Sequence, residues 1–96
     1  MSEMLETLEA IIQERKRNPV EGSYTNRLFE AGRATIAQKV GEEAVETIVA
    51  ALEQGRQEQV SEVADLFYHV LVLMAEMGIT LEDVESELEN RRQPRG

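Results

Sequence analysis

Residues 33–54 read RATIAQKVGEEAVETIVAALEQ, and residues 57–77 read QEQVSEVADLFYHVLVLMAEM, with Gly55 between the two stretches. Neither stretch contains a proline, and in both the apolar residues recur at the three- and four-residue spacing of an amphipathic helix. We therefore expect helices from about Arg33 to Gln54 and from about Gln57 to Met77, closed by Gly55 and Gly78 respectively. We interpret the pair as an antiparallel hairpin.

The apolar residues of these two helices cover more of each helix surface than a small bundle needs. On a helical wheel each set spans an arc of about 180°, whereas a helix that packs on one core needs about 100°. The two sets are Val40, Ala44, Val45, Ile48, Val49 and Leu52 in the first helix, and Val63, Leu66, Phe67, Val70, Leu71, Leu73, Met74 and Met77 in the second. The surplus apolar surface predicts that the protein forms a homodimer.

The N-terminal third of the sequence predicts one helix, one loop and a short turn. The helix runs from about Glu3 to Arg17, with Ser2 as its N-cap. Residues 18–23 have the composition of a turn and form the loop. A short turn at residues 27–31 then leads into the hairpin. The candidates for the cap of this turn are Thr25 and Asn26.

The C-terminal segment predicts a last helix, with Thr80 and Asp83 as a capping pair at its start. The fold class is therefore all-α, and we expect an antiparallel bundle of four main helices, completed by homodimerisation. We expect residues 1–92 to form a single domain and residues 93–96 to form a short C-terminal tail.

Composition excludes several classes of function. The chain has no cysteine, which excludes a disulfide framework, a thiolate zinc site and a cysteine nucleophile. Its net charge of −9 is the reverse of the basic footprint of a nucleic-acid-binding protein. No uncharged apolar run reaches the roughly 20 residues that span a bilayer, and the acidic N-terminus lacks the order of a signal peptide. We expect a cytoplasmic protein with no nucleic-acid or membrane partner.

Two pairs of acidic residues lie at the edges of the apolar arcs. Glu43 and Glu46 are three residues apart in one helix, and Glu62 and Asp65 are three residues apart in the next. Such neighbours share a helix face, with Cβ atoms about 5–6 Å apart. If the helices pack through their apolar arcs, the four carboxylates converge, and their repulsion calls for a cation.

Carboxylate oxygens without cysteine or clustered histidine suit a hard divalent ion, Mg²⁺, with Mn²⁺ as a substitute. The alternative to a metal site is an ordinary solvated helix surface. An E-x-x-E pair on a helix usually has this explanation, because glutamate is a common helix former. Two such pairs on the two helices of one hairpin favour the metal site.

Three segments carry a resemblance to a known family. Residues 23–28 (SYTNRL), 39–46 (KVGEEAVE) and 62–69 (EVADLFYH), with Gly32 between the first two, resemble phosphoribosyl-ATP pyrophosphohydrolase, an enzyme of the second step of histidine biosynthesis. The resemblance extends from about Met4 to Arg92. The paired acidic residues alone indicate a resemblance to the wider superfamily of all-α nucleoside triphosphate pyrophosphohydrolases. The SYT and KVGEEA segments narrow this resemblance to the phosphoribosyl-ATP pyrophosphohydrolase family.

The resemblance implies antiparallel helices assembled as a homodimer, Mg²⁺ dependence, and hydrolysis of phosphoribosyl-ATP to phosphoribosyl-AMP and pyrophosphate. By position it makes Glu43, Glu46, Glu62 and Asp65 the metal ligands, with Glu42 as a supporting acid. We expect Glu42 or Glu46 to accept the proton of the attacking water.

Six further side chains are candidates for substrate contacts, and each has an ordinary structural alternative. They are Lys39, Tyr24, Thr25, Arg27, Arg91 and Arg92. Lys39 is equally suited to an ion pair within its helix, and a helix C-terminus favours Arg91 and Arg92 in any case. Tyr24 and Thr25 serve equally well as a packed ring and a cap. We expect His69 to be a hydrogen-bonded supporting residue rather than a ligand or base.

Two alternative functions stay open at this point. One is a housekeeping pyrophosphatase of the same superfamily that acts on canonical or damaged nucleoside triphosphates. The other is a non-catalytic helical dimerisation module whose acidic residues are simply solvated.

Overall fold

The computed structural model describes residues 2–92, which form five α-helices and no strand. The predicted all-α class is therefore confirmed. The helices are α1 (Glu3–Arg17), α2 (Tyr24–Ala31), α3 (Arg33–Glu53), α4 (Arg56–Met77) and α5 (Leu81–Arg92). The C-terminal tail predicted at residues 93–96 lies outside the described residues.

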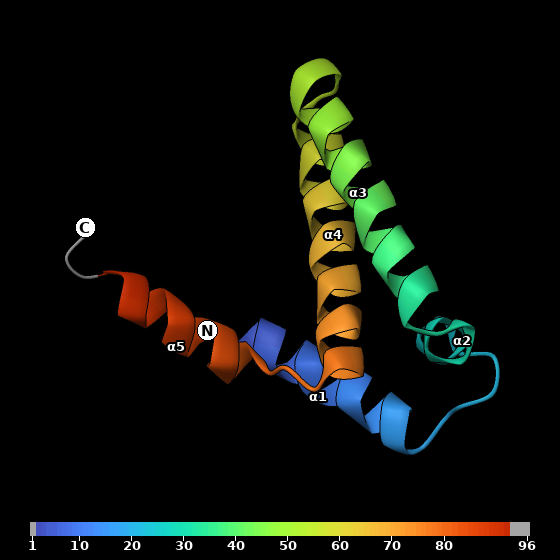
Figure 1. Cartoon of the computed structure of the whole chain (residues 1–96). Coiled ribbons are helices and arrows are strands. Elements are labelled where there is room, and N and C mark those ends of the chain that lie inside the picture. Colours follow the sequence, from blue (N-terminus) through green and yellow to red (C-terminus); the bar gives the residue numbers. More distant parts are fainter. Residues whose placement is uncertain (1, 93–96) are drawn as a thin grey trace.

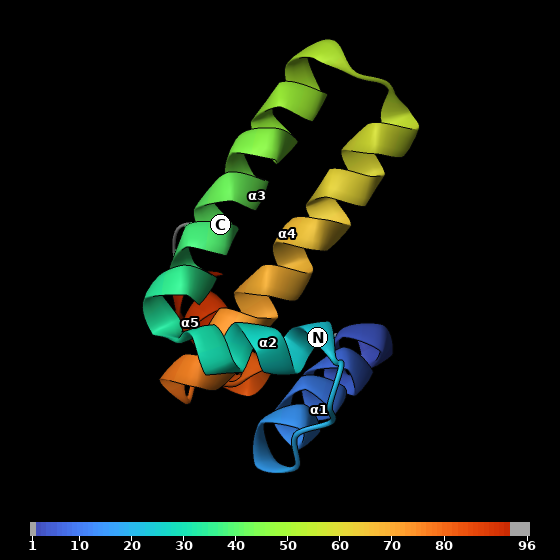
Figure 2. The ribbon, with the colours of Figure 1, turned by 90° about the vertical axis from the view of Figure 1, so that its right-hand side faces the viewer.

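The two longest helices, α3 and α4, run antiparallel and side by side as a projecting arm, while α1, α2 and α5 gather at its foot (Figures 1 and 2). At the tip of the arm, the side-chain amide of Gln59 donates to the carbonyl oxygens of Ala50 and Gln54, at 3.1 and 3.0 Å. Gly55 follows the C-cap residue of α3, Gln54, and directly precedes α4, as predicted, but its backbone is extended (φ −85°) rather than left-handed. Gly78, by contrast, ends α4 in the left-handed region (φ 74°), as predicted.

The short helix α2 corrects the prediction of a turn at residues 27–31. It begins at Tyr24, and its N-cap is Ser23, whose hydroxyl accepts from the Asn26 amide at 3.3 Å. Thr25 and Asn26 are therefore not the caps; the buried Asn26 side chain instead donates to the Arg15 carbonyl at 2.7 Å. The part of the chain that the structure describes thus has five helices, where the sequence predicted four main helices and a turn.

Two of the predicted caps are confirmed. The Ser2 hydroxyl accepts from the Leu5 amide at 3.1 Å and starts α1. At the start of α5, the Thr80 amide donates to the Asp83 carboxylate at 2.9 Å, and the Asp83 amide donates to the Thr80 hydroxyl at 3.1 Å. Each cap satisfies amides that a helix N-terminus leaves without partners.

The hydrophobic core lies at the foot of the molecule. Its buried members come from all five helices: Ile12, Leu28, Ile36, Leu71, Val72, Met74 and Leu81. Burying one such aliphatic side chain contributes about 1.5–3 kcal/mol. The upper part of the arm is different, because Ile48 and Leu52 of α3 are 58% and 79% exposed and Phe67 of α4 is 49% exposed. The foot therefore holds the arm in place, and much of the arm's apolar surface is uncovered by the chain itself.

No single helix within residues 2–92 is long and apolar enough to cross a membrane. Only α4 and α5 taken together meet that test of length and composition, and they form a pair bent by 103°.

Candidate metal centre

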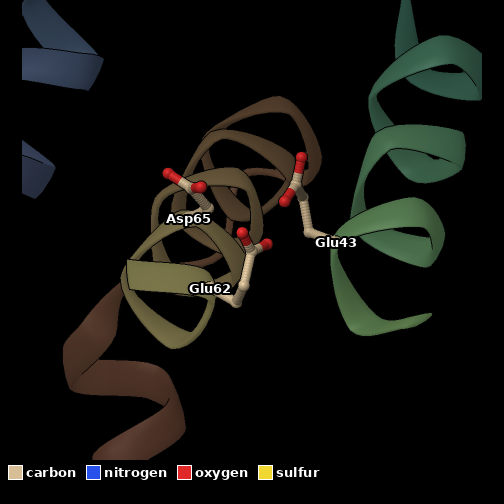
Figure 3. Close-up of side chains that lie close together, drawn as sticks. All are labelled: Glu43, Glu62 and Asp65. Carbon is tan, nitrogen blue, oxygen red and sulfur yellow. The ribbon is translucent and has the colours of Figure 1, made fainter. Parts of the chain in front are cut away.

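Three of the four predicted metal ligands come together halfway along the arm. Glu43 of α3 lies beside Glu62 and Asp65 of α4 (Figure 3), and one carboxylate oxygen from each lies within 4.8 Å of the other two. The two α4 acids share a face because they are three residues apart. The third acid comes from the neighbouring antiparallel helix. We call these three residues the acid cluster.

Glu46, the fourth predicted ligand, is exposed on α3 and is not part of the acid cluster. It borders a shallow hollow on the outer surface of the helix with Glu42 and Val45. Its charge is nevertheless close enough to contribute to the raised pKa of Glu62.

Glu62 is the acid that most needs a partner. Its Oε2 atom is buried, and the described residues offer it no hydrogen bond. Burial raises the pKa of Glu62 above the usual value, and the negative charges of Glu46, Asp65 and Glu43 raise it further. A group in this situation is stabilised by a cation. A donor set made only of carboxylate oxygens fits Mg²⁺ or Mn²⁺.

Glu42 is committed to neighbours on its own helix. It pairs with Lys39 at 3.3 Å and accepts from the Gln38 amide at 2.9 Å. The Gln38 hydrogen bond, followed by the Lys39 interaction, lowers the pKa of Glu42. Lys39 therefore forms an ion pair within its own helix, and its hydrogen bond to Glu42 raises the pKa of Lys39.

Tyr24 and Thr25, two of the predicted substrate contacts, are joined to α4. The Tyr24 hydroxyl lies 2.9 Å from Nε2 of His69, whose Nδ1 donates to the main-chain carbonyl oxygen of Asp65 at 2.7 Å. The Thr25 hydroxyl is hydrogen-bonded to the Tyr68 hydroxyl. The expected hydrogen-bonded role of His69 is thus present, and its partners identify where α2 is attached to the helix of the acid cluster.

The predicted arginines divide into two groups. Arg27 lies near Tyr24, with its guanidinium carbon 5.5 Å from the ring centroid, and it donates to the Gly22 carbonyl at 3.1 Å. Arg91 and Arg92 pair with Glu87 and Glu89 of their own helix, each at 2.8 Å. That helix, α5, leaves the foot of α4 in a direction away from the arm (Figure 1), so a single chain does not bring these two arginines to the acid cluster.

Sequence reasoning missed Thr47. Its hydroxyl donates to the carbonyl oxygen of Glu43 at 2.8 Å and lies 3.3 Å from the carbonyl oxygen of Glu62 on the facing helix. The available signal was weak: threonine is a modest helix former, and this one stands one turn after Glu43. Nothing in the spacing indicates that α4 lies within reach.

The all-helical fold and the acid cluster are typical of one class of enzyme, the all-α nucleoside triphosphate pyrophosphohydrolases. In this class, paired acidic residues on two neighbouring helices are expected to converge, as they do here. Comparison with known families narrows the class. Residues 5–92 match the family described as phosphoribosyl-ATP pyrophosphohydrolase, and the chain belongs to this family.

Curated relatives agree with this assignment. A phosphoribosyl-ATP pyrophosphatase of Metallosphaera sedula is 53% identical over 91 residues, which cover 95% of this chain and 98% of that protein. One of Sulfurisphaera tokodaii is 56% identical over 90 residues, covering 94% and 96%. The chain also resembles a histidine biosynthesis bifunctional protein of Caldanaerobacter subterraneus, with 53% identity over 93% of this chain and 43% of that protein.

Proposed function

We propose that the chain hydrolyses phosphoribosyl-ATP to phosphoribosyl-AMP and pyrophosphate in histidine biosynthesis, and that it does so with Mg²⁺. Family membership over residues 5–92, and about 50% identity to proteins named phosphoribosyl-ATP pyrophosphatase, carry the substrate and the reaction. The acid cluster supports the metal, because the buried Oε2 of Glu62 has no hydrogen-bond partner among residues 2–92.

Glu43, Glu62 and Asp65 would hold the ion, and Glu46 is a further carboxylate whose charge acts on Glu62. Mn²⁺, with similar preferences for oxygen ligands, is a substitute. When bound at such a site, Mg²⁺ neutralises charge on phosphate oxygens and lowers the pKa of a water molecule. Phosphoryl transfer asks little covalent chemistry of the protein, so positioning and charge neutralisation account for most of the catalysis.

The side chains around the acid cluster supply the remaining roles. We assign proton acceptance from the attacking water to Glu46, which is exposed beside the cluster. Glu42 is the weaker candidate, because its lowered pKa makes it a poorer base. Lys39 and Arg27 are the cations on the Tyr24 side of the cluster and would contact phosphate oxygens.

We also propose that the working form is a homodimer joined through the arm. Val45, Ile48 and Leu52 form one exposed apolar stripe along α3, because they are spaced by three and four residues. Val60 and Phe67 lie on a similar exposed stripe of α4. Monomeric soluble proteins rarely leave such continuous apolar surface in water. A second copy, with the same stripes, is a self-complementary partner.

The absence of cysteine suits a reducing cytoplasm, and the net charge of −9 argues against nucleic-acid binding. We propose a cytoplasmic enzyme whose ligands are a nucleotide and a divalent cation.

The test of the function is pyrophosphate release from phosphoribosyl-ATP, with Mg²⁺ and with a chelator, for the wild type and Asp65→Asn. We expect release that requires Mg²⁺ and is almost abolished in the variant. Faster turnover of a nucleoside triphosphate from a panel would favour the housekeeping pyrophosphatase. No turnover together with no heat of Mg²⁺ or Mn²⁺ binding would favour the dimerisation module.

A further inference from the structure

His69 connects two parts of the molecule that are distant in sequence. The side chain is 6% exposed and lies between α2 and the middle of α4. Its two ring nitrogens have different partners: Nδ1 faces the carbonyl oxygen of Asp65 at 2.7 Å, and Nε2 faces the Tyr24 hydroxyl at 2.9 Å. A buried imidazole needs a partner for each ring nitrogen, and here one partner lies on α4 and the other on α2, so the ring joins the two helices at this level.

The chemistry of the two contacts fixes the orientation of the ring. A main-chain carbonyl oxygen only accepts hydrogen bonds, so the proton of the neutral ring lies on Nδ1. Nε2 then presents its lone pair to Tyr24, whose hydroxyl donates. The rings of Tyr24 and His69 also meet edge to face, with centroids 5.8 Å apart. The turn of α4 that carries Asp65 thereby sets the position of Tyr24.

Two cations, Arg27 and Lys39, are close enough to Tyr24 to interact with it. The guanidinium of Arg27 lies 5.5 Å from the centroid of its ring. Lys39 of α3 is near enough to interact electrostatically with the Tyr24 hydroxyl. His69 therefore attaches the first turn of α2, which carries Arg27, to the turn of α4 that carries Asp65, and the charge of Lys39 acts on both Tyr24 and Glu43.

We propose that His69 is a positioning residue for phosphate binding: by holding the Tyr24 hydroxyl, it keeps Arg27 and Lys39 on one side of the acid cluster, where they receive the phosphates of the nucleotide. This inference rests on the proposed function, because it assumes that a nucleotide binds at the cluster. His69 itself does not touch the substrate. Its effect reaches the substrate through α2.

The experiment is a double-mutant cycle of Tyr24→Phe and His69→Asn. In His69→Asn, the amide nitrogen takes the place of Nδ1 and still donates to the Asp65 carbonyl oxygen, but the side chain is too short to reach Tyr24. In His69→Gln, the amide oxygen takes the place of Nε2 and still accepts from the Tyr24 hydroxyl. The loss of one hydrogen bond corresponds to a rise in KM for phosphoribosyl-ATP of roughly 3- to 10-fold. We expect that rise in Tyr24→Phe and in His69→Asn, and no further rise in the double variant. His69→Gln should be closer to the wild type, and kcat should change less than about twofold in all of them.

Ile12→Val is the control for stability. It shortens a core side chain of α1 that is 1% exposed and has no place in the site, so it should lower the melting temperature and leave KM unchanged. Multiplicative effects in the double variant, an unchanged KM in both single variants, or an equal rise in KM for Ile12→Val would overturn the positioning role.

Titration with inorganic pyrophosphate and Mg²⁺ separates this inference from the proposed function. We expect Kd for pyrophosphate to rise in the same variants by a similar factor. If the wild type releases nothing from phosphoribosyl-ATP but the Kd pattern holds, the proposed function fails and the positioning role stands. If turnover is normal and the Kd pattern is absent, only the positioning role fails. A wild type without turnover and without pyrophosphate binding overturns both.

Discussion

The hydroxyl of Thr47 on α3 lies 3.3 Å from the main-chain carbonyl oxygen of Glu62 on α4, and it donates to the carbonyl of Glu43 at 2.8 Å. These carbonyls belong to two members of the acid cluster, whose side chains repel one another. The Thr47 hydroxyl therefore joins α3 to α4 at the point where the carboxylates of the acid cluster repel one another.

Replacing Thr47 by valine keeps the shape of the side chain and removes this contact. We expect a loss of about 0.5–1.5 kcal/mol in the free energy of unfolding and a several-fold rise in the Mg²⁺ concentration for half-maximal activity. Thr47→Ser should retain both values.

Gln59→Met provides the matched control, because Gln59 links the same two helices at the tip of the arm, away from the cluster. Both Thr47→Val and Gln59→Met should lower the melting temperature, and only the former should weaken Mg²⁺ activation. Equal Mg²⁺ dependence in the two variants would reduce Thr47 to a purely structural role.

The raised pKa of Glu62 makes the stability of the metal-free protein depend on pH. The pKa of Glu62 is raised in the folded protein, chiefly by burial and then by its acidic neighbours. Between the unfolded and folded pKa values the native state binds more protons, so stability falls as pH rises through that window. The full destabilisation is present above the folded pKa.

Glu62→Gln should therefore raise the melting temperature of the metal-free protein at pH 7, and the gain should shrink as the pH falls toward 4.5, the ordinary value for a glutamate, and be absent below it. Added Mg²⁺ should reverse the order, because the wild type gains a ligand that the variant holds poorly. Thermal unfolding followed by circular dichroism measures both effects. A variant less stable than the wild type in chelator at pH 7 would contradict the electrostatic interpretation.

Removing the α3 contribution to the cluster should weaken cation binding. We expect Glu43→Gln to reduce Mn²⁺ affinity by at least roughly 10-fold in calorimetric titration, since even residues that only support a ligand have effects of this size. Glu53→Gln, an exposed change at the end of the same helix, controls for net charge. Similar losses in both variants would indicate a diffuse ion atmosphere rather than a site.

The arm interface is tested by Ile48→Glu. Ile48 is 58% exposed at the centre of the α3 stripe, and burying a charge between two chains is unfavourable. We expect light scattering to give twice the mass of one chain for the wild type and a single-chain mass for the variant. Met4→Glu alters an equally exposed apolar residue of α1 (64%) and should leave the mass unchanged. A wild type that is monomeric at all concentrations would exclude the dimer.

Local sequence was sufficient to predict the two helices of the arm and several helix ends in the rest of the chain. The caps at Ser2 and Thr80 and the glycine stop at Gly78 were predictable, because capping and left-handed backbone depend on neighbours within a few residues. The same holds for the spacing that puts Glu62 and Asp65 on one face. The short helix α2 was missed, because its residues have modest helix propensity and the Ser23 cap and buried contacts of Leu28 stabilise it.

Only the tertiary structure decided which of the paired acids meet. Helix periodicity determines that two side chains share a face, but the rotation and register of α3 against α4 depend on packing between residues far apart in sequence. That packing puts Glu43 beside Glu62 and Asp65 and leaves Glu46 outside. It also brings Tyr24 to a histidine 45 residues later. No local pattern encodes such pairings, because the free energy that selects them comes from the core at the foot of the arm.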